Sequence, residues 1–184
     1  MDYMPLTQTL TGGLLALTGA FGATWFTQWL RKRTERKNIE SAFYGEISSL
    51  LRIIELRGYI SALEQDLEDM QSSPTLTSFT HFKVTKSYFR VYENNVGKIG
   101  LLTEPLPEKI ISFYTLVFSA LEDIDEMNEA DFSGSNSDVK GTIEELLQIA
   151  REVRSVGNEI LSTIKNEPNA NPNNLLNSTK DEKA

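Results

Sequence analysis

The chain has 184 residues, no cysteine and a single histidine, His81. That length suits one compact domain with appendages and is too short for a large multi-domain enzyme. The lack of cysteine excludes disulfides, thiolate metal sites and cysteine nucleophiles, and one histidine excludes a histidine-rich metal site within one chain. The formal charge of −8 argues against general nucleic-acid binding.

The charge is divided unevenly along the chain. Residues 1–37 hold five basic and two acidic groups, whereas residues 38–184 hold 13 basic and 24 acidic groups. All the basic groups of the first part lie between residues 31 and 37: Arg31, Lys32, Arg33, Arg36 and Lys37. A basic block beside an apolar segment sets membrane topology, and it can also pair with anionic lipid headgroups.

The apolar segment runs from Leu10 to Leu30 and has 21 residues without a charge. A helix of this length covers roughly 30 Å, the thickness of a bilayer core, although its Gly and Thr residues dilute the apolar character. Trp25 and Trp29 fit an aromatic belt at one membrane surface. We therefore predict a transmembrane helix over residues 10–30. The alternatives are a signal peptide, disfavoured because the start lacks a basic region, and a buried helix of a soluble protein.

The position of the basic block after the span predicts the topology. Residues 1–9 form a short extracytoplasmic N-terminus, residues 31–37 a basic juxtamembrane segment, and the bulk of the chain lies in the cytoplasm, at the inner (plasma) membrane. Small residues recur at intervals of four within the span, a spacing that lets membrane helices approach closely. They predict helix association, including formation of a homo-oligomer, through Gly12, Ala16, Gly19, Ala20 and Ala23.

Residues 35–70 carry an apolar stripe from Ile39 through Leu56 to Met70 in steps of three or four, which predicts an amphipathic helix. No proline separates this stripe from the span, so we expect one continuous rod, weakened at Gly45 and Gly58. Ser, Thr and Pro predict a loop over residues 71–80. The next stretch, residues 81–92, alternates like a strand but also fits a helix face, and we favour a short helix ending near residue 97 or 100.

Two further helices carry regular apolar seams. The first begins around residues 103–109 and its seam is Ile110, Phe113, Val117, Ala120, Ile124 and Met127. After a loop at residues 131–138, the second has the seam Val139, Ile143, Leu146, Ala150, Val153, Gly157, Ile160 and Ile164. The fold class is therefore all-α, with the N-terminal transmembrane helix continuing into an antiparallel three- or four-helix cytoplasmic bundle over residues 38–165. The Asn- and Pro-rich residues 166–184 are expected to form a disordered tail.

The run from Tyr92 to Tyr114 is the most distinctive stretch of the chain. It resembles runs in uncharacterised bacterial and prophage-type proteins that have one N-terminal membrane helix and a helical cytoplasmic part. The positions that carry the resemblance are Tyr92, Asn95, Ile99, Gly100, Leu101, Ile110, Phe113 and Tyr114. The resemblance implies the same architecture and no known activity. The residues themselves favour a helix end, a glycine turn and a new helix start. The alternative is a partner-binding corner at Tyr92, Asn94, Asn95, Gly100 and Tyr114.

No catalytic, cofactor or metal site emerges from the sequence, which lacks both phosphate-binding glycine fingerprints and an intact calcium loop. We expect a single-pass membrane-anchored interaction protein, not an enzyme, that tethers, senses or assembles a partner. Its partners would be membrane lipids and an unidentified, basic protein rather than nucleic acid. The alternative is a small oligomerising membrane effector, of a defence or toxin-like kind, that perturbs the bilayer when triggered. An enzyme would need a site built from Glu, Asp, Lys or Tyr alone.

Overall fold

The computed structural model describes residues 4–72, 80, 86–129 and 136–166, and side-chain surroundings for most of these from Gly22 onward. All the regular elements in these ranges are helical, which confirms the all-α prediction. In chain order they are α1 (Met4–Leu56), α2 (Tyr59–Ser72), the 3₁₀ helix η1 (Lys86–Phe89), α3 (Arg90–Asn95), the 3₁₀ helix η2 (Val96–Leu101), α4 (Leu106–Glu129) and α5 (Asn136–Asn166).

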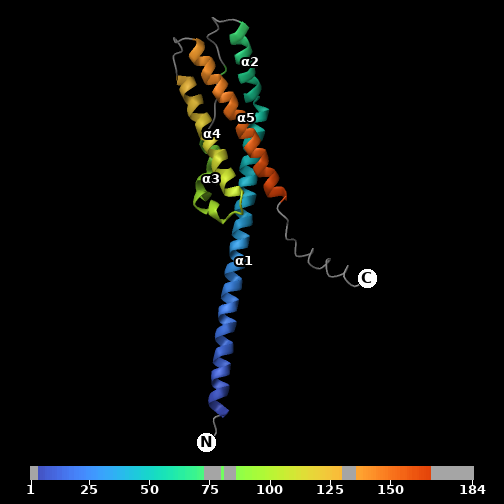
Figure 1. Ribbon diagram of the computed structural model, residues 1–184, viewed down its shortest axis with the longest axis vertical. Helices are drawn as coiled ribbons and strands as arrows, with labels where there is room; N and C mark the ends of the chain where they lie inside the picture. The colour runs from blue at the N-terminus through green and yellow to red at the C-terminus, as the bar shows by residue number, and fades with distance from the viewer. Residues whose placement is uncertain (1–3, 73–79, 81–85, 130–135, 167–184) are drawn as a thin grey trace, which may run out of the picture.

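The longest element, α1, is a single rod of 53 residues, roughly 80 Å in length at 1.5 Å per residue. Its N-terminal half projects from the bundle and its C-terminal half is part of it (Figure 1). The predicted continuation of residues 10–30 into the body is therefore confirmed, and the helix runs through Gly45 without interruption. We call residues 4–30 the N-terminal arm.

The rod ends at Gly58, which has a φ of 62° and so adopts the left-handed conformation that glycine tolerates best. The amide of Gly58 donates to the carbonyl of Glu55 at 3.1 Å, closing the last turn. The predicted apolar stripe is wrong at Leu56, which is 72% exposed at the end of α1. The apolar face resumes in α2 at a new phase, with Leu63 and Met70 buried.

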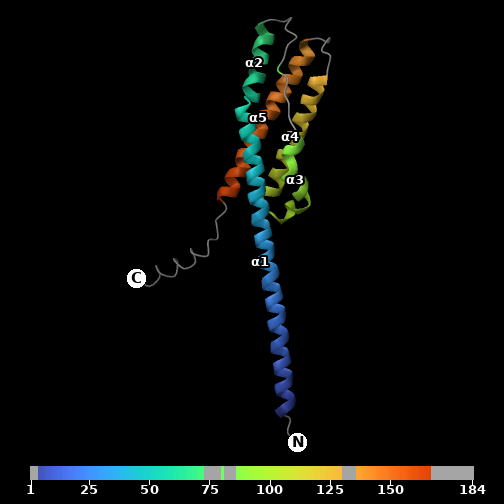
Figure 2. The same cartoon turned by 180° about the vertical axis from the view of Figure 1, so that it is seen from behind.

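The bundle has three long helical segments. The first consists of α1 and α2 in succession, the second is α4 and the third is α5. α4 and α5 run antiparallel, and α5 packs against α4, α2 and α1 (Figures 1 and 2). The predicted seams of α4 and α5 are confirmed: Ile110, Phe113, Ile143 and Ile160 have no exposed surface. The short elements η1, α3 and η2 close the end of the bundle from which the arm leaves (Figure 1).

The core is divided into two clusters along the bundle axis. The lower cluster lies nearer the arm and includes Ile39, Phe43, Ile47, Leu50, Phe89, Ile99, Leu102, Leu106, Ile110, Phe113, Tyr114, Val153 and Ile160. The upper cluster joins α2 to α4 and α5 through Leu63, Met70, Ile124, Met127, Val139, Ile143, Leu146 and Leu147.

Two sequence predictions are answered in part. Of the ambiguous segment 81–92, residues 86–89 form a 3₁₀ turn and residues 90–92 begin α3, so the helical interpretation is correct there; residues 81–85 lie outside the described ranges. Residues 10–30 are helical within α1, but no helix in the described part of the chain combines the length and the apolarity needed to cross a membrane. The Gly and Thr residues of this segment dilute its hydrophobicity. The predicted tail, beyond residue 166, and residues 1–3 are also outside the described ranges.

Candidate functional site

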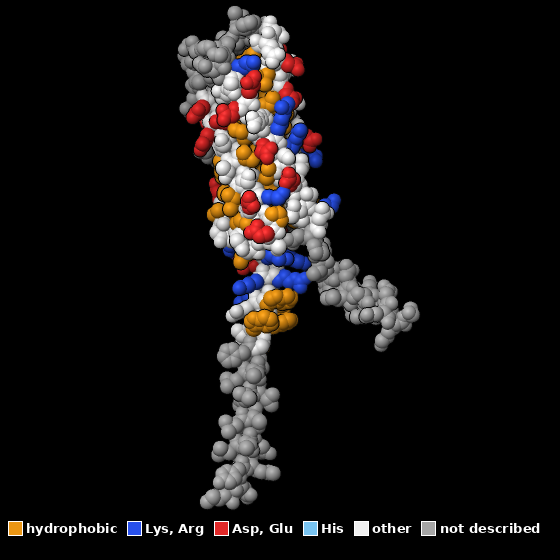
Figure 3. Space-filling model, in the orientation of Figure 1, with side chains coloured by type: hydrophobic (Ala, Val, Ile, Leu, Met, Phe, Trp, Pro, Cys, Tyr) orange, Lys and Arg blue, Asp and Glu red, His pale blue; other side chains and the backbone are white. Residues whose placement is uncertain are grey.

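Exposed aromatic side chains gather where the arm meets the bundle. Trp25, Phe26, Trp29 and Leu30 are exposed by 72%, 54%, 46% and 42%. Directly after them come Arg31, Lys32 and Arg33. In Figure 3 a group of hydrophobic side chains lies just below a ring of Lys and Arg side chains at this level. We call residues 25, 26 and 29–33 the aromatic–cationic collar.

The collar is partly ordered by its own contacts. The rings of Phe26 and Trp29 stack with centroids 6.1 Å apart, and the Arg33 guanidinium lies 5.6 Å from the centroid of Trp29. These contacts orient the aromatic rings on the helix without burying them. The rings can therefore still contact a lipid surface. The arrangement suits a membrane–water interface, where Trp rings meet headgroups and cations meet phosphates.

One further cation of the predicted basic block, Arg36, is tied to the bundle. Arg36 pairs with Glu40 at 3.2 Å and donates to the Thr103 hydroxyl at 2.8 Å, linking α1 to the turn before α4. Beside it, Lys98 of η2 pairs with Glu35 of α1 at 2.7 Å. Of the five predicted cations, Arg31, Lys32 and Lys37 are exposed, whereas Arg33 and Arg36 are half-buried. Arg36 therefore has a structural role that the sequence did not indicate.

The small residues of the arm are placed on α1, as predicted, but their environments are described only in part. Ala23 is exposed. The side-chain surroundings of Gly12, Ala16, Gly19 and Ala20 lie outside the description, so helix association through them stays a prediction.

The predicted partner corner is dominated by internal contacts. Tyr114 has no exposed surface, and its ring stacks on the half-buried Tyr92 with centroids 4.0 Å apart. Asn94 and Asn95 donate to the carbonyls of Arg90 and Val91, one turn earlier, at 2.7 and 2.8 Å. Gly100 is exposed in η2. The parts of this corner that a partner could reach are therefore Asn94 and the backbone around Gly100.

A carboxylate that sequence reasoning missed lies behind this corner. Glu46 of α1 accepts the backbone amides of Val91 and Tyr92 at 2.6 and 3.1 Å, so it caps the first turn of α3. It also accepts the Tyr114 hydroxyl at 2.5 Å. Burial, followed by the bond to this carboxylate, raises the pKa of Tyr114 far above its ordinary value of 10.0. The phenol therefore stays protonated and acts as a donor.

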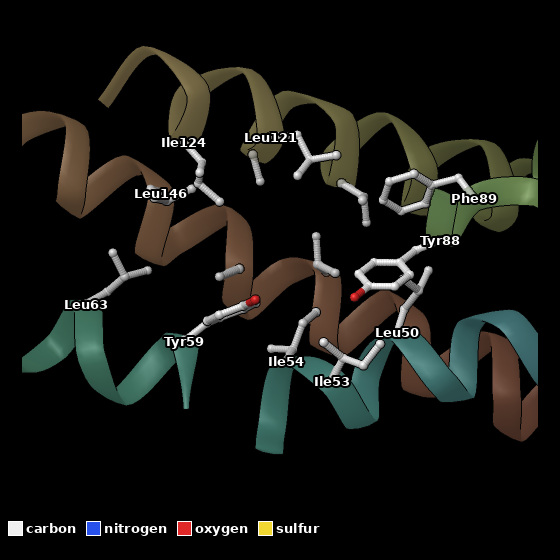
Figure 4. A pocket seen from close by; sticks show the side chains of 14 residues that line it. Leu50, Ile53, Ile54, Tyr59, Leu63, Tyr88, Phe89, Leu121, Ile124 and Leu146 are labelled. Carbon is white, nitrogen blue, oxygen red and sulfur yellow. The ribbon is translucent and has the colours of Figure 1, made fainter. Parts of the chain in front are cut away.

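An apolar cavity of about 80 Å³ lies between the two core clusters. Ile54 and Tyr59, on either side of the break between α1 and α2, both line it (Figure 4). Its fourteen lining side chains are Leu50, Ile53, Ile54, Tyr59, Leu63, Tyr88, Phe89, Val117, Ala120, Leu121, Ile124, Leu146, Ala150 and Val153. Tyr59 and Tyr88 alone among them carry a side-chain oxygen. The cavity arises because two seam positions that face it, Ala120 and Ala150, have small side chains.

Acidic side chains accumulate on the neighbouring surface of α4 and α5. Partial burial, together with the negative charges of Glu145, Glu126 and Glu122, raises the pKa of Asp123. The three glutamates therefore make this surface locally negative. Within the described ranges no three His, Asp or Glu side chains are grouped as ligands for a metal ion.

Comparisons with protein-family models, with curated proteins and with solved structures found no match to this chain. The resemblance of the run from Tyr92 to Tyr114 therefore stays a prediction, and the functional argument depends on the chain's own geometry.

Proposed function

We propose that the chain is a membrane-anchored helical interaction protein, held at the cytoplasmic face of a membrane by the N-terminal arm. The observation that carries the proposal is the aromatic–cationic collar. Four large apolar side chains are exposed on a helix that has left its bundle, and three cations follow them at once. Exposed apolar groups gathered at one level mark a membrane or protein interaction site, and the cations beside them favour the membrane.

The energetics favour a lipid surface. Each Trp or Phe ring presents on the order of 150–250 Å² of surface, and burying apolar area contributes about 25 cal/mol per Å². Each of Arg31, Lys32 and Arg33 adds about 1 kcal/mol near anionic lipids. Together these contributions are enough for stable association of the arm with a bilayer. Insertion of the arm across the bilayer is the stronger form of the proposal. When the arm is inserted in the bilayer, pairing with another helix through Gly12, Ala16 and Ala20 would offset the modest apolarity of the arm.

The body is proposed to act by recruiting a partner. Residues 38–184 carry 13 basic and 24 acidic groups, so anionic lipids repel the bundle and leave its sides free. The acidic surface around Asp123 favours a basic protein. In this arrangement the arm supplies the location and the bundle supplies the recognition surface.

Flotation with vesicles of phosphatidylethanolamine and phosphatidylglycerol tests the anchor. We expect the full chain to float with the vesicles and a Trp25→Ser/Trp29→Ser variant to remain largely at the bottom of the gradient. The matched control is Ile111→Ser, because Ile111 is 49% exposed but lies on α4, away from the arm. Equal flotation of all three proteins would contradict the proposal. Release of an encapsulated dye would instead favour the membrane-effector alternative.

Single cysteines test the insertion, since the chain has none of its own. In cells treated with a membrane-impermeant maleimide, we expect Asp2→Cys to react and Ser119→Cys to react only after lysis. Ser119 is exposed on α4, so the chain itself does not protect it from the reagent. Reaction at both positions, or at neither, in intact cells would overturn the proposed insertion across the bilayer. Attachment of the arm to the membrane surface is tested separately, by the flotation assay.

A further inference from the structure

The cavity between the two core clusters has features of a ligand site that the membrane proposal does not use. We propose that it binds the hydrocarbon chain of a fatty acid, whose carboxylate is held by Arg57 at the cavity rim. The inference does not depend on the arm or on attachment to a membrane.

The interior of the cavity suits hydrocarbon and not water. Its lining consists of Leu, Ile, Val, Ala and Phe side chains and two tyrosine rings. A buried water needs two or more polar partners, and cavities without such partners stay dry and take up apolar ligands. The volume of about 80 Å³ has room for a few methylene groups, which corresponds to the end of an alkyl chain and not to a whole lipid.

The cavity has an open side through which a longer chain can leave. Eight of the fourteen lining side chains are only half-buried: Val117, Ala120, Leu121 and Ala150 on α4 and α5, and Ile53, Ile54, Tyr59 and Tyr88 around the break. The last four are the ones next to Arg57. They come from three elements, α1, α2 and η1, that meet where the rod is broken at Gly58. A linear chain can therefore enter end-on, keep its tip among the lining residues of α4 and α5, and carry its head group to the surface.

The rim defines the chemistry of that head group. Tyr59 and Tyr88 point their hydroxyls toward one another in Figure 4. The Arg57 guanidinium donates to the Tyr59 hydroxyl at 2.7 Å, and its pKa is raised first by Tyr59 and also by Tyr88. It therefore lies beside the Tyr59 phenol, whose hydroxyl faces that of Tyr88 (Figure 4). A guanidinium fork and neighbouring phenol groups are donors matched to a carboxylate, and the positive charge selects an anion over a neutral alcohol or ester.

Photolabelling of the full chain tests the proposal. The probe is a long-chain fatty acid with a diazirine near its methyl end, and the labelled peptides are identified by mass spectrometry. We expect label on cavity residues of α4 and α5, such as Leu121 and Val153, and competition by unlabelled fatty acid of equal length. The corresponding fatty alcohol should compete about tenfold less well, because it lacks the charge that Arg57 binds.

Matched variants assign the label to the site. Ala150→Leu fills the cavity from α5 and Ala120→Leu fills it from α4, so either variant, with an unchanged circular dichroism spectrum, should lose most of the cavity label. Arg57→Gln should weaken labelling by the acid about tenfold and leave the weaker competition by the alcohol unchanged. Arg52→Gln is the control, because Arg52 is exposed on α1, whereas Arg57, in the turn after α1, reaches the cavity through its bond to the lining residue Tyr59.

The proposal is overturned by any of three results. The first is label confined to the arm and unchanged in both filled variants. The second is equal competition by acid and alcohol. The third is no saturable label at the cavity, which would mean that another part of the chain or no ligand occupies it.

Discussion

The carboxylate of Glu46 and the phenol of Tyr114, 68 positions apart in the chain, are joined by a hydrogen bond of 2.5 Å. The same carboxylate caps α3 through the amides of Val91 and Tyr92. One acidic side chain of α1 therefore fixes both α3 and α4 at the end of the bundle nearest the arm. Because Tyr114 also stacks on Tyr92, the polar contact and the aromatic contact hold the same three elements together.

Replacing this carboxylate should destabilise the whole bundle. In Glu46→Ala the two amides and the phenol lose their acceptor, and we expect a loss of about 3 kcal/mol in the free energy of unfolding, measured with urea. Glu55→Ala, at an exposed position one residue before the end of the same helix, should change it by less than about 0.5 kcal/mol. Similar losses in both variants would show that Glu46 has no special role.

The raised pKa of Tyr114 predicts how stability depends on alkaline pH. Below the ordinary tyrosine value of 10.0 the phenol is protonated in both the folded and the unfolded chain. Above it, only the unfolded chain loses the proton, so stability should fall by up to about 1.4 kcal/mol per pH unit from this group. Unfolding curves between pH 9 and 11 measure this fall. It should be shallower in Tyr114→Phe than in Tyr44→Phe, whose ring is 38% exposed; identical slopes would refute the assignment.

The two glycines of the leading rod should respond to alanine in opposite directions. Neither would bring a new Cβ within 4 Å of another group, so only the backbone decides. Gly45 is inside α1, and Gly45→Ala should stabilise the fold by about 0.5–1 kcal/mol. Gly58 has a φ of 62°, and Gly58→Ala should destabilise it by about 1–2 kcal/mol. Thermal melts of both variants, each compared with the unaltered chain, check the two signs; a stabilising Gly58→Ala would show that the break does not need glycine.

Gly157 should be intolerant of alanine for a steric reason. A Cβ at this position would lie 2.9 Å from the Phe113 ring and 3.0 Å from Leu51. Gly157→Ala should therefore destabilise the packing of α5 on α1 and α4 by about 1–3 kcal/mol, despite the better helix propensity of alanine. Shortening Leu51 in the double variant Gly157→Ala/Leu51→Ala tests the cause. A destabilisation that is simply additive would rule out the proposed clash with Leu51.

The long helices could be predicted because their apolar residues repeat without interruption. In α4 and α5 the seams from Ile110 and Val139 keep one phase to the helix end, so burial followed from spacing alone. Leu56 was assigned wrongly because steps of three residues, from Leu50 to Ile53 to Leu56, rotate away from the buried face of a helix with 3.6 residues per turn. The sequence also does not show which of two glycines breaks a helix. The difference between Gly45 and Gly58 is set by what the following residues must pack against.

The candidate sites were predictable only where they are local in sequence. The collar follows from consecutive residues, Trp25 to Arg33, so composition revealed it. The Glu46 contacts and the pairing of Arg36 with Thr103 join segments far apart and left no local signal. The cavity was hidden for a different reason. In the sequence, Ala120 and Ala150 fit the pattern of an apolar seam as well as Leu would. The space is created by their small side chains, which come from two different helices.

The unbroken path of α1 from Met4 to Leu56 has a mechanical consequence. A helix without a hinge transmits tilt and rotation along its axis, and its far end is clamped to α5 and α3. Any change in the inclination of the arm must therefore swing the whole bundle through the same angle. The direction in which the acidic faces of α4 and α5 point therefore depends on the inclination of α1.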